Sequence, residues 1–356
     1  MEMPRRFSSS SRSVSMPVSA RTRAVLPWSI CPAVPATMES MRSLFMLLPA
    51  IAFAAPAQEP TPPTPTFTTG TAQVRVDVQV ASGRSIVSGL TKEDFVVYDD
   101  RQPQAILGFG QESEPVRLLL LLDISGSMRK HLQEMAKAAK TALGFLRPRD
   151  EVGVMMFSRE AQVTDDFNDQ PEAVAQSLER ATFDLDLGGG TAINAAILKA
   201  AEYFHEETRK ETGPQRNRRF AILVVTDNMS TSYKTPDEEV VKALYREDIV
   251  LNAIVTGKGY RPQSGPAGQY ANPDFSPADV FKLAEETGGE AVKADRADAA
   301  FREMLERLRT RYSLIYRAPD DTVTGRFRYI NVQLAPAARQ RHPKAQVRHR
   351  NGYYVR

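Results

Sequence analysis

Two uninterrupted apolar runs in the middle of the chain each end in an aspartate. The run VRLLLLLD occupies residues 116–123 and ends in Asp123. The run RRFAILVVTD occupies residues 218–227 and ends in Asp227. Strands that are apolar on both faces are typical of parallel sheets covered by helices on both sides. The pattern therefore predicts two central strands, each of which brings an aspartate to the carboxyl end of one sheet.

Segments of helical periodicity alternate with the apolar runs. Met135, Ala139 and Leu143, for example, would share one face of a helix. This alternation continues for about 200 residues and predicts an α/β fold with a doubly wound parallel sheet of the Rossmann-like type over residues 114–312. Helices are predicted at residues 131–146, 170–181, 191–207, 235–248, 276–289 and 297–312, and further strands at 151–158, 249–257 and 290–294.

Strand patterns of period two flank this α/β region on both sides. Val74, Val76, Val78 and Val80 alternate with polar residues, as in a strand with one buried face. Because the regions at 71–113 and 313–356 are both rich in such patterns, we expect them to pair in one small β-sandwich-like domain, with the α/β domain inserted between them. The further flanking strands are predicted at 94–100, 104–112, 312–319, 325–334 and 344–356.

Composition and charge narrow the possible functions. The chain has 356 residues, with 46 basic and 43 acidic side chains and a net charge of +3. Residues 1–40 hold five arginines and two glutamates, so the rest of the chain is neutral and carries no general charge for binding nucleic acid. The single cysteine, Cys31, also lies there. Disulfides, thiolate metal sites and cysteine nucleophiles are therefore excluded beyond residue 40.

The N-terminal region has the form of an export signal. Residues 41–57, MRSLFMLLPAIAFAAPA, combine Arg42 with an apolar run of 11 residues and small residues suited to cleavage. That run is too short to cross a bilayer, so we predict a secreted, periplasmic or cell-surface protein. Translation would then begin at Met38 or Met41, and residues 1–40 would be non-native or a disordered extension. A Pro/Thr-rich linker is predicted at 58–70.

Oxygen-bearing side chains gather where the predicted strands end. Asp123, Ser125 and Ser127 occupy alternate positions directly after the first apolar run. Thr191 follows three glycines at the start of a predicted helix, and Asp227 ends the second run. Ligands bind at the carboxyl ends of strands in open α/β sheets. Two carboxylates and three hydroxyls, with neither imidazole nor thiol, favour a hard cation such as Mg²⁺, Mn²⁺ or Ca²⁺.

The three segments DISGSM, GGGT and VVTD together resemble the loops of a von Willebrand factor type A domain and its metal-ion-dependent adhesion site. The flanking segments, which include GLTKEDFVVYDDRQPQ and NGYYVR, are similar to the related proteins of acidobacteria. This resemblance covers about residues 71–356. It implies that Ser125 and Ser127 bind the metal directly, that Thr191 does so in the ligand-ready state, and that Asp123 and Asp227 act mainly through water.

The resemblance also implies a function in binding. An aspartate or glutamate of a protein ligand would complete the coordination of the metal, as in adhesion, and the chain would not be an enzyme. The same site could instead serve an envelope assembly or scaffold subunit. One departure from the family is Asn228, where the family usually has glycine; Asn tolerates the left-handed backbone conformation better than most residues.

Two other interpretations remain. Asp123 and the serines could merely cap the predicted helix at 131–146. A hydrolase is suggested by the Ser-x-x-Lys pattern at 127–130, but this pattern is short and lacks a companion motif. The four histidines lie in no spacing suited to a nucleophile and its base, and the chain has neither a Walker loop nor a GxGxxG motif.

Overall fold

The computed structural model describes residues 73–355, except for 112–113, 145, 171, 173, 175, 177–186, 188, 211–217, 233, 258–278, 295–296 and 321–322. The predicted signal peptide, the segment before it, the linker and most of the predicted helix at 170–181 therefore lie outside the described residues. Among the residues that are described, no helix is both long enough and apolar enough to cross a bilayer.

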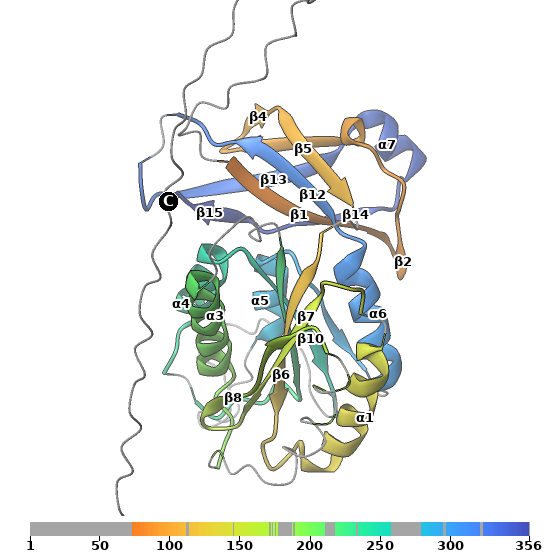
Figure 1. The fold of residues 1–356 in the computed structure, drawn as a ribbon. Helices are drawn as coiled ribbons and strands as arrows, with labels where there is room; N and C mark the ends of the chain where they lie inside the picture. Colours follow the sequence, from red (N-terminus) through yellow and green to blue (C-terminus); the bar gives the residue numbers. More distant parts are fainter. Residues whose placement is uncertain are drawn as a thin grey trace, which may run out of the picture. The chain divides into compact units, whose positions relative to one another are not determined.

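The α/β region is built on one six-stranded sheet with the order β11-β10-β9-β6-β7-β8 (Figure 1). Strand β6 lies in its interior and pairs in parallel with β9 on one side and β7 on the other. The chain leaves β6 toward β7 but later continues outward from β9, so the sheet is doubly wound, as predicted. Its strands are β6 (Val116–Asp123), β7 (Glu151–Phe157), β8 (Ala161–Asn168), β9 (Arg219–Thr226), β10 (Ile249–Val255) and β11 (Ala291–Lys293).

Strand β8 departs from the prediction, because it runs antiparallel to β7 at the edge of the sheet. The chain reverses over three residues after Phe157, where the Ser158 N–H donates to the carbonyl of Glu160 at 2.9 Å. Strand β8 contains Thr164, Asp165 and Asp166 and is only partly buried along most of its length. A polar edge strand lacks the apolar run that identifies the interior strands.

Helices cover both faces of the central sheet and explain why β6 is apolar throughout. Leu118 and Leu120 pack with helices α1 and α6, whereas Leu119 and Leu121 face α3, α4 and α5. Burying each leucine stabilises the fold by roughly 2 kcal/mol. The helices are α1 (Leu132–Leu143), α3 (Ile193–Lys210), α4 (Asp237–Arg246), α5 (Val280–Glu286) and α6 (Ala297–Arg309), with a short 3-10 turn, η2 (Arg129–His131), before α1.

The flanking segments form two further antiparallel sheets, as predicted. One has the order β14-β1-β12-β5, with β2 beside β1, and the other has the order β15-β13-β3-β4. Their apolar faces share one core with valines of β1 and aromatic residues of β12. The strands are β1 (Gln73–Ser82), β2 (Ser85–Ile86), β3 (Phe95–Asp99), β4 (Gln102–Gln104), β5 (Ile106–Gln111), β12 (Tyr312–Arg317), β13 (Phe327–Leu334), β14 (Gln346–Arg348) and β15 (Gly352–Tyr354), with a 3-10 turn, η1 (Lys92–Asp94).

The C-terminal part of this sandwich contains a helix that the sequence did not predict. Helix α7 (Pro336–Arg341) follows β13 directly and starts with proline at its first turn, a position where the missing N–H costs nothing. Six residues are too few to display a helical period, which explains the omission. The last predicted strand, 344–356, is two short strands that belong to different sheets.

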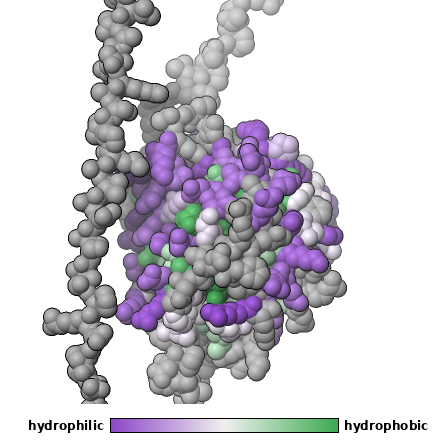
Figure 2. All heavy atoms as spheres, turned by 60° about the horizontal axis from the view of Figure 1, so that its bottom comes forward, coloured by the Kyte–Doolittle hydropathy of each residue, from purple (hydrophilic) through white to green (hydrophobic). Residues whose placement is uncertain are grey.

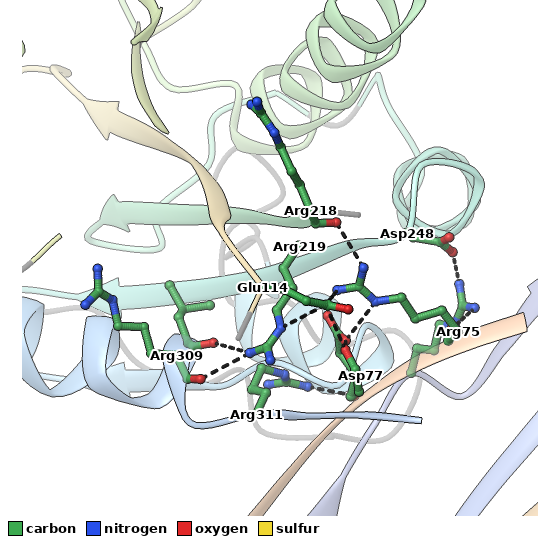
Figure 3. Close-up of polar contacts among 11 residues, drawn as sticks. Arg75, Asp77, Glu114, Arg218, Arg219, Asp248, Arg309 and Arg311 are labelled. Atoms are coloured by element: carbon green, nitrogen blue, oxygen red, sulfur yellow. Dashed lines mark hydrogen bonds and ion pairs between the residues drawn. The ribbon is translucent and has the colours of Figure 1, made fainter. Parts of the chain in front are cut away.

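A network of arginines and carboxylates joins the sandwich to the amino ends of the parallel strands (Figure 3). Arg75 of β1 donates to the carbonyl of Arg218 at 3.1 Å, and it also pairs with Glu114 at 2.7 Å and Asp77 at 3.2 Å. Arg219, at the start of β9, also faces Glu114. Burial would raise the pKa of Asp77, but the arginines around it, Arg75 first, lower that pKa well below its ordinary value.

Arg311 is the most deeply buried member of this network. It lies between α6 and β12 and is only 1% exposed. Its guanidinium donates to the carbonyl of Asp77 at 3.1 Å and to that of Gly288 at 2.7 Å. Arg350, close to the C-terminus, pairs with Asp248 at the start of β10. The sandwich is therefore attached at the end of the central sheet opposite to Asp123.

Candidate metal centre

Asp123 ends β6 and is fully buried. One carboxylate oxygen, Oδ1, accepts the backbone N–H of Ser125 at 2.9 Å. The other, Oδ2, accepts the hydroxyl of Thr226 at 2.6 Å. Asp123 thus fixes the start of the loop that follows β6 and links that loop to the end of β9, the neighbouring strand. Both oxygens are used in this way, so capping of α1 does not account for this carboxylate.

The hydroxyls of Ser125 and Ser127 lie 3.2 Å apart and form a hydrogen bond in which either oxygen can be the donor. Ser125 is buried and Ser127 is exposed. The loop between them is held by the Met128 N–H, which donates to the Ser125 carbonyl at 3.0 Å, and by the fully buried Met128 side chain. Neighbouring ligands of an octahedral Mg²⁺ lie about 2.9 Å apart at the usual Mg–O distance, and those of Ca²⁺ lie somewhat farther apart. The serine hydroxyls are therefore spaced like two ligands of one cation.

Asp227 follows β9 and is also buried. Its Oδ1 accepts the N–H of Met229 at 3.1 Å, which closes a tight turn. The hydroxyl of Thr226 accepts the N–H of Asn228 at 3.1 Å while it donates to Asp123. Thr226 therefore connects the loops that carry Asp123 and Asp227. Thr226 was not among the predicted site residues, although its place directly before the strand-ending aspartate was a usable signal.

Asn228 occupies the left-handed region with φ +58°, as expected for a residue that replaces glycine. Its side chain is fully buried, and Oδ1 accepts the N–H of Val280 at 3.3 Å, at the start of α5. A glycine could adopt the same backbone conformation but could not make this bond. Asn228 therefore attaches the loop after β9 to α5.

Thr191 is buried, and its backbone joins it to the loop after β9. Its N–H donates to Thr231 Oγ1 at 2.8 Å, and its carbonyl accepts the Thr231 N–H at 2.8 Å and the Ser230 hydroxyl at 3.1 Å. Gly190 has φ +98°, and a Cβ there would come within 2.7 Å of Thr231 Oγ1. These bonds use only backbone atoms of Thr191, and Gly190 must stay small for the two loops to approach.

Ser158, which follows β7, also forms hydrogen bonds with the loop that carries Thr191. Its hydroxyl donates to the carbonyl of Leu187 at 2.8 Å, and its carbonyl accepts the N–H of Ala192 at 2.8 Å. Ser158 is 2% exposed. Ser158 was not among the predicted site residues, because a single serine after a strand carries no recognisable motif.

The electrostatics at Asp123 favour a bound cation. Burial raises its pKa to about 6, the bonds from Thr226 and Ser125 oppose that rise, and the nearby charge of Asp227 adds to it. A cation next to both carboxylates would relieve the cost of burying like charges. The described residues contain no group of three or more His, Cys, Asp or Glu side chains that could hold a metal. Any metal here would depend on hydroxyl ligands, and the all-oxygen donors present fit a hard cation.

These loops lie where the chain connections from β6 and β9 diverge, the usual ligand position in an open α/β sheet. Figure 2 brings the lower end of Figure 1 forward, and hydrophilic residues cover most of the coloured surface in this view. Hydrophobic residues are scattered over it rather than gathered in one patch.

Comparison with known proteins agrees with this fold and assigns its class. Residues 118–229 match the family model of the von Willebrand factor type A domain, and this part of the chain is such a domain. The inter-alpha-trypsin inhibitor heavy chain H4 of Sus scrofa is 32% identical over 135 residues, which cover 36% of this chain. The match spans only 14% of that relative's length.

Solved structures resemble the chain more distantly. An aerotolerance-related membrane protein of Bacteroides fragilis is 20% identical, with a TM-score of 0.41 over 54% of this chain and 98% of its own. The manganese-loaded TRAP protein of Plasmodium vivax is 13% identical, with a TM-score of 0.40 over 68% and 98%. Mussel proximal thread matrix protein 1 with a zinc-occupied adhesion site is 17% identical, with a TM-score of 0.38 over 55% and 47%. At these scores the likeness supports no conclusion about this chain's function.

Proposed function

We propose that the chain binds a protein ligand through a divalent cation, Mg²⁺ or alternatively Mn²⁺ or Ca²⁺. Ser125, Ser127 and Thr191 would be direct ligands, and Asp123 and Asp227 would act mainly through water. The observation that carries the proposal is the 3.2 Å spacing of the two serine hydroxyls beside two buried carboxylates from neighbouring strands.

The charge balance of these donors explains why an outside ligand would be needed. Serine and threonine hydroxyls are neutral, so they leave the positive charge of a cation largely uncompensated. Both oxygens of Asp123 already accept hydrogen bonds from the protein. A hard cation in this position would attract a further carboxylate, and an aspartate or glutamate of a partner protein supplies one. This chemistry requires binding alone, with no reaction.

The predicted signal peptide indicates the cellular compartment in which this binding would occur. Export through residues 41–57 would set the chain in the periplasm, in the medium or at the cell surface. Adhesion or another protein interaction outside the cytoplasm is then the proposed role. N-terminal sequencing of the mature protein tests the export, which requires a start near residue 58.

Metal binding is tested by titrating the purified chain with Mg²⁺ and Mn²⁺ in a calorimeter. The wild type should bind one ion, and Ser125→Ala should bind it at least about tenfold more weakly, as expected when a metal ligand or its support is lost. At a Mg²⁺ concentration of 100 times Kd, the ion should also stabilise the fold by about 2.7 kcal/mol, and EDTA should reverse this. The matched control is Ser88→Ala, which removes an exposed hydroxyl of the sandwich.

Equal metal affinity in wild type and Ser125→Ala would contradict the metal site. If the metal binds as expected, a pull-down from an envelope extract with and without EDTA then tests the ligand. A partner that is lost with EDTA and with Asp123→Ala supports metal-dependent binding. A partner that stays bound through both changes contradicts it.

A further inference from the structure

A cleft of about 1290 Å³ lies between the outer face of the β13–β3 sheet and helices α4 and α5. None of the five candidate metal residues lines it. Its size is sufficient for a ligand of several rings. The cleft therefore offers a second binding position that the proposed metal function does not use.

The floor of this cleft consists of outward-facing side chains of the sandwich. Tyr329, Asn331 and Gln333 alternate along β13 on its exposed side. Tyr98 of β3 lies directly opposite Asn331. Tyr329 is 67% exposed, which is unusual for a large side chain on a regular strand. The outer face of the sheet thus combines aromatic rings with amides.

Other aromatic residues of the lining contact this floor. The Phe327 ring meets the Tyr329 ring edge-on at 5.0 Å between centroids and the Tyr354 ring at 5.1 Å. Tyr245 of α4 stacks on Phe327 at 5.8 Å. These contacts restrict the rings before any ligand arrives, and a preorganised aromatic surface loses little entropy on binding.

The charged residues that line the cleft are four carboxylates and two cations. Asp237 pairs with Lys282 at 3.1 Å, and Glu286 accepts the Asn351 amide at 2.8 Å. Asp100 lies 3.4 Å from Arg328 of β13 and 3.4 Å from Arg326, which precedes that strand. Glu238 and Arg101 complete the charged lining and carry opposite charges. The net negative lining disfavours a polyanion, and the ion pairs of Asp237 and Asp100 reduce its attraction for a basic peptide.

The turn between β3 and β4 also lines the cleft. Asp100 and Arg101, between β3 and β4, have φ +46° and +70° although neither is glycine. Both values are those of a two-residue type I′ hairpin turn, in which the two central residues require positive φ. Asp100 exchanges two bonds with Tyr329: its N–H donates to the Tyr329 carbonyl at 2.9 Å, and its Oδ1 accepts the Tyr329 N–H at 3.0 Å. The turn thus fixes the backbone that carries the exposed ring.

We propose that this cleft binds a neutral oligosaccharide. The C–H face of a sugar ring packs well on a tyrosine ring, which is an apolar surface with a polar tip. Sugar hydroxyls both donate and accept, and so do the amides of Asn331 and Gln333. The carboxylate of Glu238 can only accept, so it needs a ligand with hydroxyl or other donors. A proline-rich peptide would also stack on tyrosines but lacks those donors.

The test is a titration of the purified chain with neutral hexasaccharides of glucose, mannose and N-acetylglucosamine. At least one should bind, and Tyr329→Ala and Asn331→Ala should each weaken binding about tenfold, a loss of 1.4 kcal/mol. Gln346→Ala, on an exposed position of the other sheet, should bind as the wild type does. Thermal unfolding of each variant checks that the fold is intact.

EDTA should leave sugar binding unchanged, because the cleft contains no candidate metal residue. Failure of the metal proposal and failure of this one are therefore distinguishable. Absence of binding for all three sugars at concentrations up to about 5 mM would overturn the proposal. Preferential binding of a sulfated hexasaccharide or a lysine peptide, or binding that Tyr329→Ala leaves unaffected, would overturn it too.

Discussion

At the scale of single residues, the side chain of Thr226 connects two of the three loops at the candidate metal centre. Its hydroxyl donates to Asp123 at 2.6 Å and accepts from the backbone of Asn228 at 3.1 Å. Asn228 in turn reaches α5 through its side chain. None of these three contacts involves a side chain that we propose as a direct metal ligand. They act by holding the aspartates in place, and outer residues of this kind commonly tune metal affinity.

Replacing Thr226 with valine keeps the shape of the side chain but removes its hydroxyl. We expect Thr226→Val to lower stability by about 1–3 kcal/mol, because a carboxylate oxygen and an N–H lose their partners in the interior. Mg²⁺ affinity should fall at least about tenfold. Urea unfolding and calorimetric titration measure the two effects.

The variant Thr226→Ser should restore both quantities, since it retains the hydroxyl. Thr256→Val is the matched control: that hydroxyl lies at the end of the neighbouring strand and donates only to the sulfur of Met128, at 3.5 Å. Wild-type Mg²⁺ affinity in Thr226→Val would show that the two loops hold their positions without this hydroxyl.

At the scale of elements, the strands with the most continuous apolar runs were the ones the sequence predicted best. β6 and β9 are buried on both faces, so nearly every position contributes to the apolar pattern that predicts an interior strand. β8 and α7 were missed because the first is a polar edge strand and the second has only six residues.

The motif residues of the candidate site could also be recognised in the sequence, because they follow strands at regular positions. Ser158 and Thr226 were not, because each acts through a partner that is distant in sequence: Leu187 for Ser158 and Asp123 for Thr226. Only the folded chain brings such partners together.

Substitutions on either face of the central strand β6 should lower the stability of the chain. Leu120 and Leu121 face opposite helical layers, and both are almost fully buried. We expect Leu120→Ala and Leu121→Ala each to destabilise the chain by about 2–5 kcal/mol, since each leaves a cavity in a close-packed core. Leu107→Ala, at a leucine that is 59% exposed, should change stability by no more than about 0.5 kcal/mol. Chemical denaturation compares the three, and a small cost for either β6 variant would contradict two-sided packing.

At the scale of the whole molecule, a network of charged contacts joins the sandwich to the von Willebrand factor type A domain (Figure 3), beside the stack of Tyr245 on Phe327. Asp77 is central to this junction. It accepts from Arg75 at 3.2 Å and from the Ser313 hydroxyl at 2.8 Å. Buried charges of this kind are costly when one partner is removed, because the others remain without compensation.

Asp77→Asn should therefore destabilise the chain by about 3 kcal/mol at neutral pH. The pKa of Asp77 in the folded chain lies below its ordinary value. As the pH falls below about 4, the unfolded chain takes up this proton first. The stability that Asp77 contributes is therefore complete above that pH and is lost on acidification toward the folded pKa.

Urea unfolding of wild type and Asp77→Asn from about pH 6 to about pH 2.5 tests this linkage, and the difference between them should shrink below about pH 4. Asp320→Asn, which affects an exposed pair with Arg317, should cost less than about 1 kcal/mol at any pH. A difference between wild type and Asp77→Asn that stays constant with pH would show that the carboxylate charge is not what stabilises the junction.

Strands β5 and β12 are adjacent and antiparallel, with Gln111 opposite Tyr312, so the whole intervening stretch of about 200 residues takes the place of a hairpin loop. The entropy of closing a loop rises only slowly with its length. In the topology of the sandwich, the von Willebrand factor type A domain thus occupies the position of the turn between β5 and β12. The chain enters and leaves the domain at adjacent positions. The domain could therefore be exchanged for a short loop, or for another domain, without changing the pairing of the strands on either side.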